Sequence, residues 1–334
     1  MTAIDFDSLF EKLSSIKAGV LGDVMLDTYW WGHVDRISPE APVPVVALDK
    51  KEYRIGGAGN VALNLASLGS NVSVISMIGD DDDGVVLKKM FDANRINTDF
   101  LLPGASRITT NKSRIISRNQ QMMRLDAEMT KDLEPADEDR LIAQVEIFLQ
   151  RVQPHVMVFE DYNKGVLTEK VIGEVIRLCK KHGVISAVDP KRKNFFAYHG
   201  VDIFKPNLKE VRDGLNLISE DVNLSILEDI HAQLQHRLQH NISFITLSEK
   251  GVFYKQNNSA RIIPSHFRNI SDVSGAGDTV IAVASLLYAA TKNIDLMAEV
   301  ANIAGGIVCE EVGTVAIRKD TLLQECKQLL STQS

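Results

Sequence analysis

The sequence is poor in cysteine, with only Cys179, Cys309 and Cys326 among its 334 residues. An odd and widely spaced set does not form a disulfide framework, so we expect reduced thiols buried as small hydrophobic side chains. Long apolar runs are also missing. The longest, 280–290, is too short to span a bilayer and contains Ser285. We therefore expect no membrane partner.

An export signal and an excess of positive charge are lacking as well. Segment 1–17 contains acidic residues and no apolar stretch of signal-peptide length, which indicates a cytoplasmic protein. Lys and Arg number 37 against 44 Asp and Glu, a net charge of −7. A nucleic-acid-binding protein needs a basic face, so we expect no nucleic-acid partner. No linker, repeat or low-complexity tract divides the chain, which predicts a single domain over 1–334.

Short β-branched runs alternate with longer segments of helical spacing. The predicted strands are 18–21, 72–78, 156–159, 185–188 and 244–247. The predicted helices are 60–68, 137–152, 168–182, 224–238 and 279–290. This alternation predicts an α/β fold, with a mostly parallel central sheet flanked by helices and ligands at the carboxyl ends of the strands.

Two stretches break the alternation. Segment 36–48 contains three prolines before an apolar run, and 100–126 has an extended pattern around a turn. Prolines at this density belong on edge strands or in turns. We predict that the two stretches form a small β-sheet lid, over about 33–55 and 98–127, projecting from the main domain.

A first glycine-rich site lies at 55–65, where Gly56, Gly57 and Gly59 precede Asn60. Its G-x-G-x-x-A spacing matches the dinucleotide fingerprint, but that motif follows a buried strand, whereas 49–54 is polar. A helix-capping turn explains one glycine. Close approach of a ligand to the backbone explains all three, and Asn60 offers a donor and an acceptor to hydroxyl groups.

A second glycine-rich site, D-V-S-G-A-G-D at 272–278, precedes the predicted helix 279–290. Free N–H groups and the helix dipole make a helix N-terminus an anion site. The N–H groups concerned belong to Gly275, Ala276 and Gly277. Asp278 could be an N-cap, but an acid beside a phosphate site repels the phosphate unless it serves as base for the attacking hydroxyl. We predict a phosphotransferase with Asp278 as the catalytic base.

Other charged residues follow predicted strands. Asn207 and Glu210 stand at a strand-to-helix junction, where they could organise Mg²⁺ partly through water or form a capping box. Segments 160–165 and 189–191 also end strands in charge. The four acids at 80–83 are more typical of a solvated helix start.

Cations gather in the predicted lid. Lys112, Arg114 and Arg118 stand at even positions, hence on one face of an extended strand, and Arg124 follows a turn. Such a row is either a solvated edge that discourages aggregation or a pocket for a phosphate already on the substrate. Charge alone leaves both open.

The motifs at 56–60, 207–210 and 272–278 resemble those of the ribokinase-like (PfkB) carbohydrate kinases, in order and across nearly the whole chain. Longer strings resemble the heptose 7-phosphate kinases of ADP-heptose and lipopolysaccharide precursor synthesis within that family; they lie at 22–27, 36–45, 117–121 and 161–165. The resemblance implies a ribokinase-like fold and ATP-dependent phosphorylation of the anomeric hydroxyl of D-glycero-D-manno-heptose 7-phosphate. No H-x-G-H motif is present, so we expect the free-standing form, with nucleotidyl transfer left to another enzyme.

The same resemblance implies roles for particular residues. Those expected at the sugar are Asp27, Gly56, Gly57, Asn60 and Asp161, with Lys112, Arg118 and Arg124 on the 7-phosphate. Those expected near ATP are Asn207, Ser248, Gly251, Asn302 and Gly305, with Asn207 and Glu210 organising Mg²⁺. Asp272 and Ser274 match positions that hold a monovalent cation such as K⁺, whereas 311–314 departs from the pattern. The lid implies a homodimer.

Alternatives with the same chemistry are kinases for fructose phosphates or nucleosides. An alternative of another class is a non-catalytic sugar or nucleotide sensor on the same fold. Retention of Asp278 beside intact glycines argues against a sensor.

Overall fold

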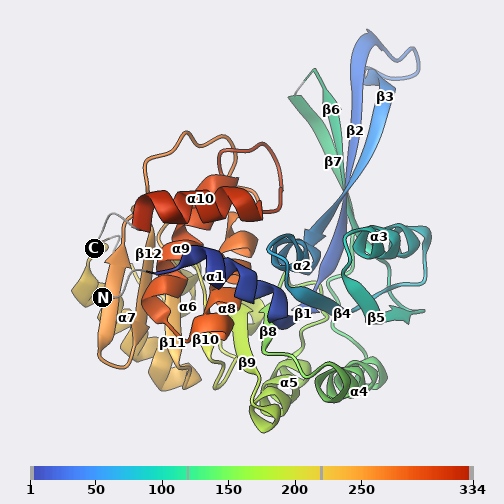
Figure 1. Ribbon diagram of the computed structural model, residues 1–334. Helices are drawn as coiled ribbons and strands as arrows, with labels where there is room; N and C mark the ends of the chain where they lie inside the picture. The colour runs from blue at the N-terminus through green and yellow to red at the C-terminus, as the bar shows by residue number, and fades with distance from the viewer. Residues whose placement is uncertain (1–3, 119, 219–220, 331–334) are drawn as a thin grey trace.

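The computed structural model describes residues 4–118, 120–218 and 221–330, which form two sheets and the helices around them (Figure 1). The strands of the large sheet are β1 (Lys17–Gly22), β4 (Asn71–Gly79), β5 (Asn97–Gly104), β8 (Val156–Glu160), β9 (Ile185–Asp189), β10 (Ile203–Phe204), β11 (Ile242–Thr246), β12 (Val252–Gln256) and β13 (Ser259–Ile263). Those of the small sheet are β2 (Val24–Ile37), β3 (Pro44–Gly57), β6 (Thr110–Ser117) and β7 (Gln120–Ala127).

The α-helices are α1 (Phe6–Lys12), α2 (Ala58–Ser67), α3 (Asp82–Ala93), α4 (Pro135–Val152), α5 (Glu169–His182), α6 (Leu208–Leu215), α7 (Leu224–Leu238), α8 (Ala276–Thr291), α9 (Ile294–Val308) and α10 (Lys319–Leu330). Short 3₁₀ turns are η1 (Leu13–Ser15), η2 (Arg192–Asn194) and η3 (Ser248–Lys250). The predicted helices and strands are confirmed, with shifts of a few residues at their ends.

The large sheet has the order β13-β12-β11-β10-β9-β8-β1-β4-β5. From β5 to β11 all neighbours are parallel, and only β12 and β13 pair antiparallel at one edge. The predicted mostly parallel sheet is therefore confirmed. Its parallel strands all present their carboxyl ends at one edge, which is where α/β folds bind ligands.

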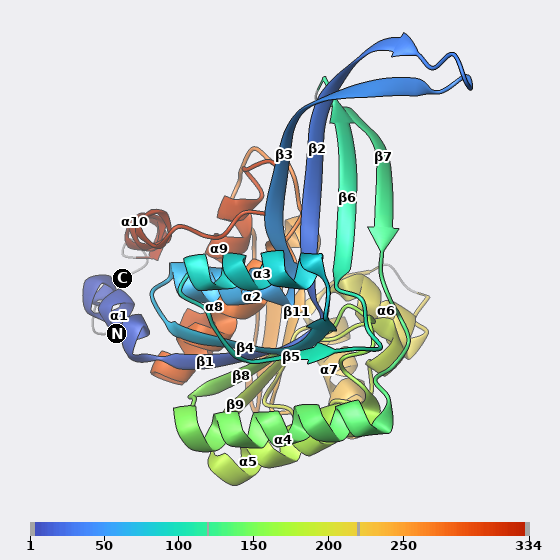
Figure 2. The same ribbon diagram turned by 90° about the vertical axis from the view of Figure 1, so that its right-hand side faces the viewer.

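Side chains of the central strands alternate between two hydrophobic layers. On β8, Val156 and Val158 pack in one layer while Met157 and Phe159 pack in the other. Helices α1, α2, α3, α8, α9 and α10 line the first layer, and α4, α5, α6 and α7 line the second (Figure 2). The expected buried, unpaired cysteines are confirmed. Within the described residues, no helix combines the length and apolarity that a membrane span requires.

The small sheet, in the order β3-β2-β6-β7, projects away from the large one (Figure 1). Two of the prolines lie between β2 and β3, and Pro44 begins the edge strand β3, as a residue without an N–H requires. The predicted bounds of the lid were partly wrong. The small sheet already begins at Val24, and segment 97–104 pairs with β4 in the large sheet. An extended pattern shows that a segment is a strand but does not show which sheet it joins.

Candidate active site

The carboxyl ends of neighbouring strands gather charged residues at one place. β8 ends at Glu160 and β9 at Asp189, and the first turn of α8 contributes Asp278. One oxygen of each carboxylate lies within 4.8 Å of the others, and all three residues are buried. Such a concentration of like charge has to be compensated by cations, protons or hydrogen-bond donors.

Asp278 is held by two donors from distant parts of the chain. Asn60 Nδ2 donates to Asp278 Oδ2 at 2.7 Å, and the Tyr162 hydroxyl donates to Asp278 Oδ1 at 2.8 Å. Burial raises the pKa of Asp278 to about 6, while these two hydrogen bonds act in the opposite direction. The carboxylate is therefore ionised at neutral pH and poised to accept a proton.

The glycine loop before α8 leaves space beside this carboxylate. Gly275 has φ +78°, and a Cβ there would lie 2.9 Å from Asn60 Nδ2 and 3.0 Å from Thr314. Only glycine satisfies both constraints. The loop residues Gly275, Ala276 and Gly277 are partly exposed. The N–H of Ala276 makes a long hydrogen bond of 3.3 Å to the Val273 carbonyl. The helix start is thus accessible to an anion.

Two lysines pair with Asp189, and one of them lies close to the glycine loop. Lys205 Nζ is 2.7 Å from one oxygen of Asp189, and Lys191 Nζ is 3.1 Å from the other. Burial opposes ionisation of Asp189, but the two ammonium groups outweigh it and hold its pKa below the usual value. A Cβ on Gly277 would lie 3.6 Å from Lys205 Nζ. Positive charge therefore lies next to the predicted anion site.

Glu160 lies among these groups without a hydrogen bond to either carboxylate oxygen, although it is fully buried. Burial, followed by the neighbouring Asp189 and Asp278, raises its pKa well above the usual value. Glu160, Asp189, Asp278 and Glu210, which also accepts from Lys191, outnumber the two ammonium groups. A proton on Glu160 reduces this excess of negative charge.

Asn207 and Glu210 form the capping box that was one of the two alternatives. Asn207 Oδ1 accepts the Glu210 N–H, and Glu210 Oε2 accepts the Asn207 N–H, each at 2.8 Å. Glu210 Oε1 also accepts from Lys191 at 3.0 Å. These atoms fit Mg²⁺ only through its water shell, because Mg²⁺ retains several waters in such sites. Their magnesium role stays a prediction.

The structure brings Asp272 and Ser274, predicted to hold a monovalent cation, next to segment 311–314. Asp272 Oδ1 accepts from the N–H and hydroxyl of Ser274, and its Oδ2 accepts from the N–H of Gly313. Burial works against the charge of Asp272, yet these hydrogen bonds keep its pKa below the usual value. Segment 311–314 therefore lies beside Asp272, while the cation itself stays a prediction.

Contacts within the protein explain why glycine stands at the three positions of the first motif. Gly56 would place a Cβ 2.6 Å from the carboxylate of Asp27, and Gly57 has φ +59°. A Cβ on Gly59 would lie 2.4 Å from Ile55. Close packing is thus a sufficient reason for glycine at 59, while ligand approach at Gly56 and Gly57 stays a prediction. Asn60 donates a hydrogen bond to Asp278, while its predicted contact with a sugar stays a prediction.

The face of the small sheet that contains Asp27 carries alternating charge. Along one row the register aligns Arg54, Asp27, Lys112 and Asp126; along the next it aligns Glu52, Tyr29, Arg114 and Arg124. Arg114 Nη1 is 2.6 Å from Asp27 Oδ1, and both Arg54 and Arg114 lie over the Tyr29 ring. A Cβ on Gly313 would lie 2.6 Å from Arg54 Nη1. This face, called the inner face below, is therefore turned toward the glycine loop.

Arg118 is not part of the inner face. β6 ends at Ser117, and Arg118 has φ +48° in the exposed turn to β7. The alternation that aligned it with Lys112 and Arg114 stops at that turn, so its predicted placement was wrong. Lys112 and Arg124 do lie on the inner face, although Arg124 is paired with Asp126 at 2.8 Å.

Asp161 has a different environment from the one expected at a sugar. Its Oδ1 accepts the Asn163 N–H at 2.8 Å, and its Oδ2 accepts the Tyr198 hydroxyl at 2.9 Å. Burial raises its pKa to about 6. It is 1% exposed, so it braces the segment after β8 instead of offering free oxygens.

The predicted ATP residues lie around β11, β12 and α9. Ser248 begins η3 and Gly251 directly follows it, with φ +58° and +94°. Asn302 Nδ2 donates to the Pro264 carbonyl at 2.8 Å. A Cβ on Gly305 would lie 2.7 Å from Val280, so this glycine lets α8 and α9 pack closely. Contacts of these residues with a nucleotide stay predictions.

Comparison with known proteins gives the family. Residues 16–321 match the pfkB family carbohydrate kinases. Bifunctional protein HldE of Geobacter sulfurreducens is 37% identical over 320 residues, covering 93% of this chain and 63% of that protein. Its namesake in Caulobacter vibrioides is 41% identical over 302 residues, covering 88% and 60%. The chain belongs to the pfkB carbohydrate kinase family.

As a member of this family the protein is a phosphotransferase that acts on a sugar. This pfkB family kinase spans less than two thirds of the length of those relatives. Phosphofructokinase-2 from Escherichia coli in complex with potassium has a TM-score of 0.75 at 19% identity, covering 95% of this chain and 99% of that one. Arabidopsis thaliana ribokinase complexed with ribose and ATP has a TM-score of 0.69 at 16% identity, covering 92% and 98%. These structures confirm the predicted ribokinase-like fold.

The structure also brings to the Asp278 cluster residues of the pfkB family kinase to which the sequence assigned no role in the site. Tyr162, Asp189, Lys191 and Lys205 all contact the Asp278 cluster directly or through a shared ion pair. Each lies within two residues of a strand end. Charge directly after a buried strand was the available signal, but it could not say which strand ends are neighbours.

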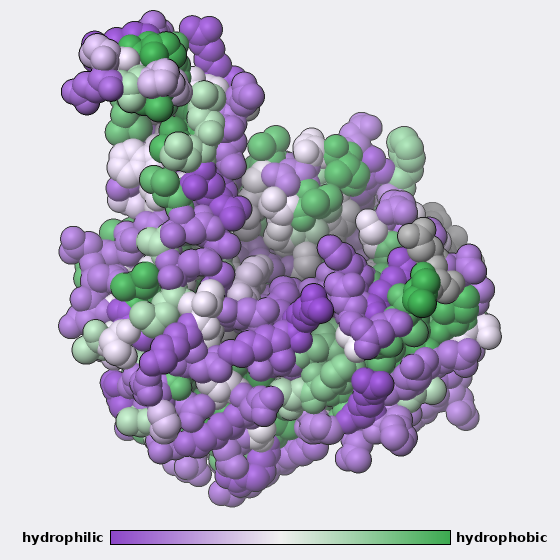
Figure 3. Space-filling view, turned by 180° about the vertical axis from the view of Figure 1, so that it is seen from behind, coloured by the Kyte–Doolittle hydropathy of each residue, from purple (hydrophilic) through white to green (hydrophobic). Residues whose placement is uncertain are grey.

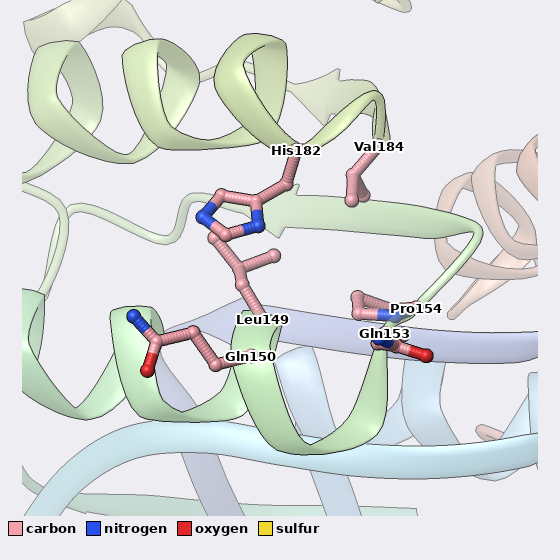
Figure 4. A pocket seen from close by; sticks show the side chains of 6 residues that line it. All are labelled: Leu149, Gln150, Gln153, Pro154, His182 and Val184. Atoms are coloured by element: carbon pink, nitrogen blue, oxygen red, sulfur yellow. The ribbon is translucent and has the colours of Figure 1, made fainter.

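A surface hollow on this kinase lies at the opposite edge of the large sheet. Its volume is about 470 Å³, and it is lined by Leu149, Gln150, Gln153, Pro154, His182 and Val184 (Figure 4). These residues precede β8 and β9, at their amino ends. The molecule is also hollowed between the projecting small sheet and the main body (Figure 3). That second hollow is on the side expected for ligands, because α/β sheets bind at carboxyl ends.

Proposed function

We propose that this kinase transfers the γ-phosphoryl group of ATP to the anomeric hydroxyl of D-glycero-D-manno-heptose 7-phosphate. The observation that carries the proposal is the buried Asp278 carboxylate, held by Asn60 and Tyr162 directly beside the glycine loop. An ionised acid next to an anion site has a chemical reason only if it takes the proton of the attacking hydroxyl. The heptose assignment is supported by the similarity to the two HldE proteins.

In this mechanism Asp278 accepts the proton as the hydroxyl oxygen attacks in line. The N–H groups at the start of α8, together with Lys191 and Lys205, stabilise the charge that develops on the transferred group. Asn207 and Glu210 would hold Mg²⁺ through water, and the ion would neutralise phosphate charge when bound. A monovalent cation such as K⁺ would lie at Asp272 and Ser274.

The inner face provides the acceptor site in this proposal. Asp27, Gly56, Gly57 and Asn60 would bind sugar hydroxyls, and the inner-face cations would bind the 7-phosphate. Arg114 and Arg54 replace Arg118 in this role, because they lie beside Asp27 and Gly313 respectively. An arginine fork matches phosphate oxygens in geometry and charge.

We further propose a homodimer through the lid. The opposite, outer face of the small sheet aligns Trp30, Ile115 and Met123 in one row, with Leu125 in the next. Met123 and Leu125 are each 54% exposed. A second copy of the chain would cover this apolar face, since exposed apolar patches of this kind mark association surfaces.

The proposal is tested by following ADP release with heptose 7-phosphate, fructose phosphates, ribose and a nucleoside as acceptors, with Asp278→Ala as the blank. We expect turnover only with the heptose phosphate, and phosphorus NMR of the product should show a phosphate on the anomeric carbon. Faster turnover of a fructose phosphate or a nucleoside would identify that compound as the acceptor in place of the heptose phosphate. Absence of ADP release with every acceptor would favour a sensor.

A further inference from the structure

The segment between β8 and α5 contacts the catalytic carboxylate through one side chain. The Tyr162 hydroxyl donates to Asp278 Oδ1 at 2.8 Å, from the opposite side of the carboxylate to the Asn60 amide, which binds Oδ2. Burial raises the pKa of Tyr162 well above its usual value, so the hydroxyl keeps its proton and remains the donor. Lys191 Nζ lies 5.6 Å from the centre of its ring.

The backbone of this segment is fixed by a single buried acid. Asp23, directly before β2, accepts the N–H groups of Tyr162 at 2.9 Å, Lys164 at 3.0 Å and Val166 at 3.1 Å. Three convergent N–H donors stabilise a carboxylate that is only 2% exposed. The position of Tyr162 is thus set from the start of the small sheet.

A second contact joins the same segment to the end of the small sheet. Lys164 Nζ is 2.7 Å from Glu128 Oε2, and Glu128 directly follows β7. Both side chains are largely shielded, at 14% and 25% exposure, so the ion pair is less screened than one on an open surface. The segment is therefore held both by Asp23, just before the small sheet begins, and by Glu128, just after it ends.

Resting on the proposed role of Asp278 as base, we propose that Tyr162 is a positioning residue for phosphoryl transfer. Its hydroxyl holds the Asp278 carboxylate in the orientation in which it accepts the proton, and the two ends of the small sheet hold Tyr162. Each carboxylate oxygen has a further lone pair, so the substrate hydroxyl can donate while Tyr162 stays in place. A movement of the small sheet would therefore alter the orientation of the Asp278 carboxylate through the Tyr162 hydrogen bond.

The contact has a measurable consequence for proton uptake. A donor to the ionised form favours that form, so its loss raises the pKa of Asp278 beyond about 6. The other titratable groups facing Asp278 are Glu160 from β8, Asp189 and Lys191 from the end of β9, and Lys205 from the end of β10. None of these residues is replaced when the Tyr162 hydroxyl is removed.

The experiment compares kcat/KM against pH for wild type, Tyr162→Phe and Tyr198→Phe in the full chain. We expect Tyr162→Phe to shift the acid limb of the profile, the pH range over which kcat/KM falls on acidification, upward by about one to two pH units. Loss of a hydrogen bond to a charged group implies a shift of this size. At higher pH its rate should rise to a plateau below that of wild type, because the carboxylate is then ionised but no longer held in its orientation, with KM for ATP unchanged. Lys164→Met should move the limb in the same direction by less.

Tyr198→Phe is the matched control, because it removes a buried hydroxyl from Asp161 on the same segment. It should lower thermal stability and leave the limb in place. An unshifted limb in Tyr162→Phe, or an equal shift in Tyr198→Phe, overturns the proposal. Turnover by Asp278→Asn would instead overturn the proposed base, so the two failures are distinguishable. Thermal unfolding of each variant verifies that the chain is folded.

Discussion

The carboxylate of Asp278 loses its water on folding and gains hydrogen bonds from Asn60 and Tyr162. Burial outweighs these bonds, because the pKa rises from 3.8 to about 6. The folded state therefore holds this proton more tightly than the unfolded chain. The stability that the proton provides is present below about pH 4 and is lost as the pH rises through about 6.

Asp278→Asn should consequently lower the activity while raising the free energy of unfolding. We expect kcat to fall by roughly 10²- to 10⁴-fold because the base is removed, with little change in ATP affinity. At about pH 8 the free energy of unfolding should rise by roughly 1–3 kcal/mol, since the ionised group is no longer buried. Denaturant titrations at about pH 8 and pH 4 should show this gain only at the higher pH. Near-normal turnover would reject the base.

At the scale of elements, the inner face of the small sheet depends on strand register. Asp27 on β2 lies beside Lys112 on β6, while Arg114, two residues along, forms its ion pair. Arg118 lies past the end of β6, in the exposed turn. The sequence predicted the alternation correctly but not the residue at which it stops, because a turn interrupts the period.

Arg114→Met and Arg118→Ala make a matched pair of lid variants. Arg114→Met should raise KM for the phosphorylated sugar by about ten-fold or more, because the acceptor loses a charged partner and Asp27 is left unpaired. Arg118→Ala should leave KM within about two-fold of wild type, in the range of an exposed charge. Steady-state kinetics with varied acceptor and saturating ATP measures both. A larger effect at Arg118 would contradict the placement.

On the scale of the whole molecule, the small sheet has one charged and one apolar face. Trp30, Ile115 and Met123 lie in one row of the outer face, where Lys51 covers Trp30 at 4.2 Å. Exposed sheet faces of this kind favour association. The inner face faces the glycine loop, so association through the outer face leaves the proposed acceptor site open.

Leu125→Glu should therefore shift the protein from dimer to monomer, because it places a charge in the proposed interface. Val85→Glu is the control, since Val85 is similarly exposed, at 53% against 54% for Leu125, but lies on α3 of the main domain. Sedimentation velocity at several concentrations measures the distribution. A monomeric wild type, or a dimer unaffected by Leu125→Glu, would reject the interface.

Much of this kinase follows from local pattern. The alternation of strands and helices determined the α/β fold. The D-V-S-G-A-G-D segment determined a glycine-rich helix start with an acid in its first turn, because a helix start is set by nearby residues. Strand order was decided only by the tertiary structure. It brings Glu160, Asp189 and Lys205 from β8, β9 and β10 to Asp278. It also places Tyr162 on that carboxylate, since contacts between distant segments depend on packing and not on spacing along the chain.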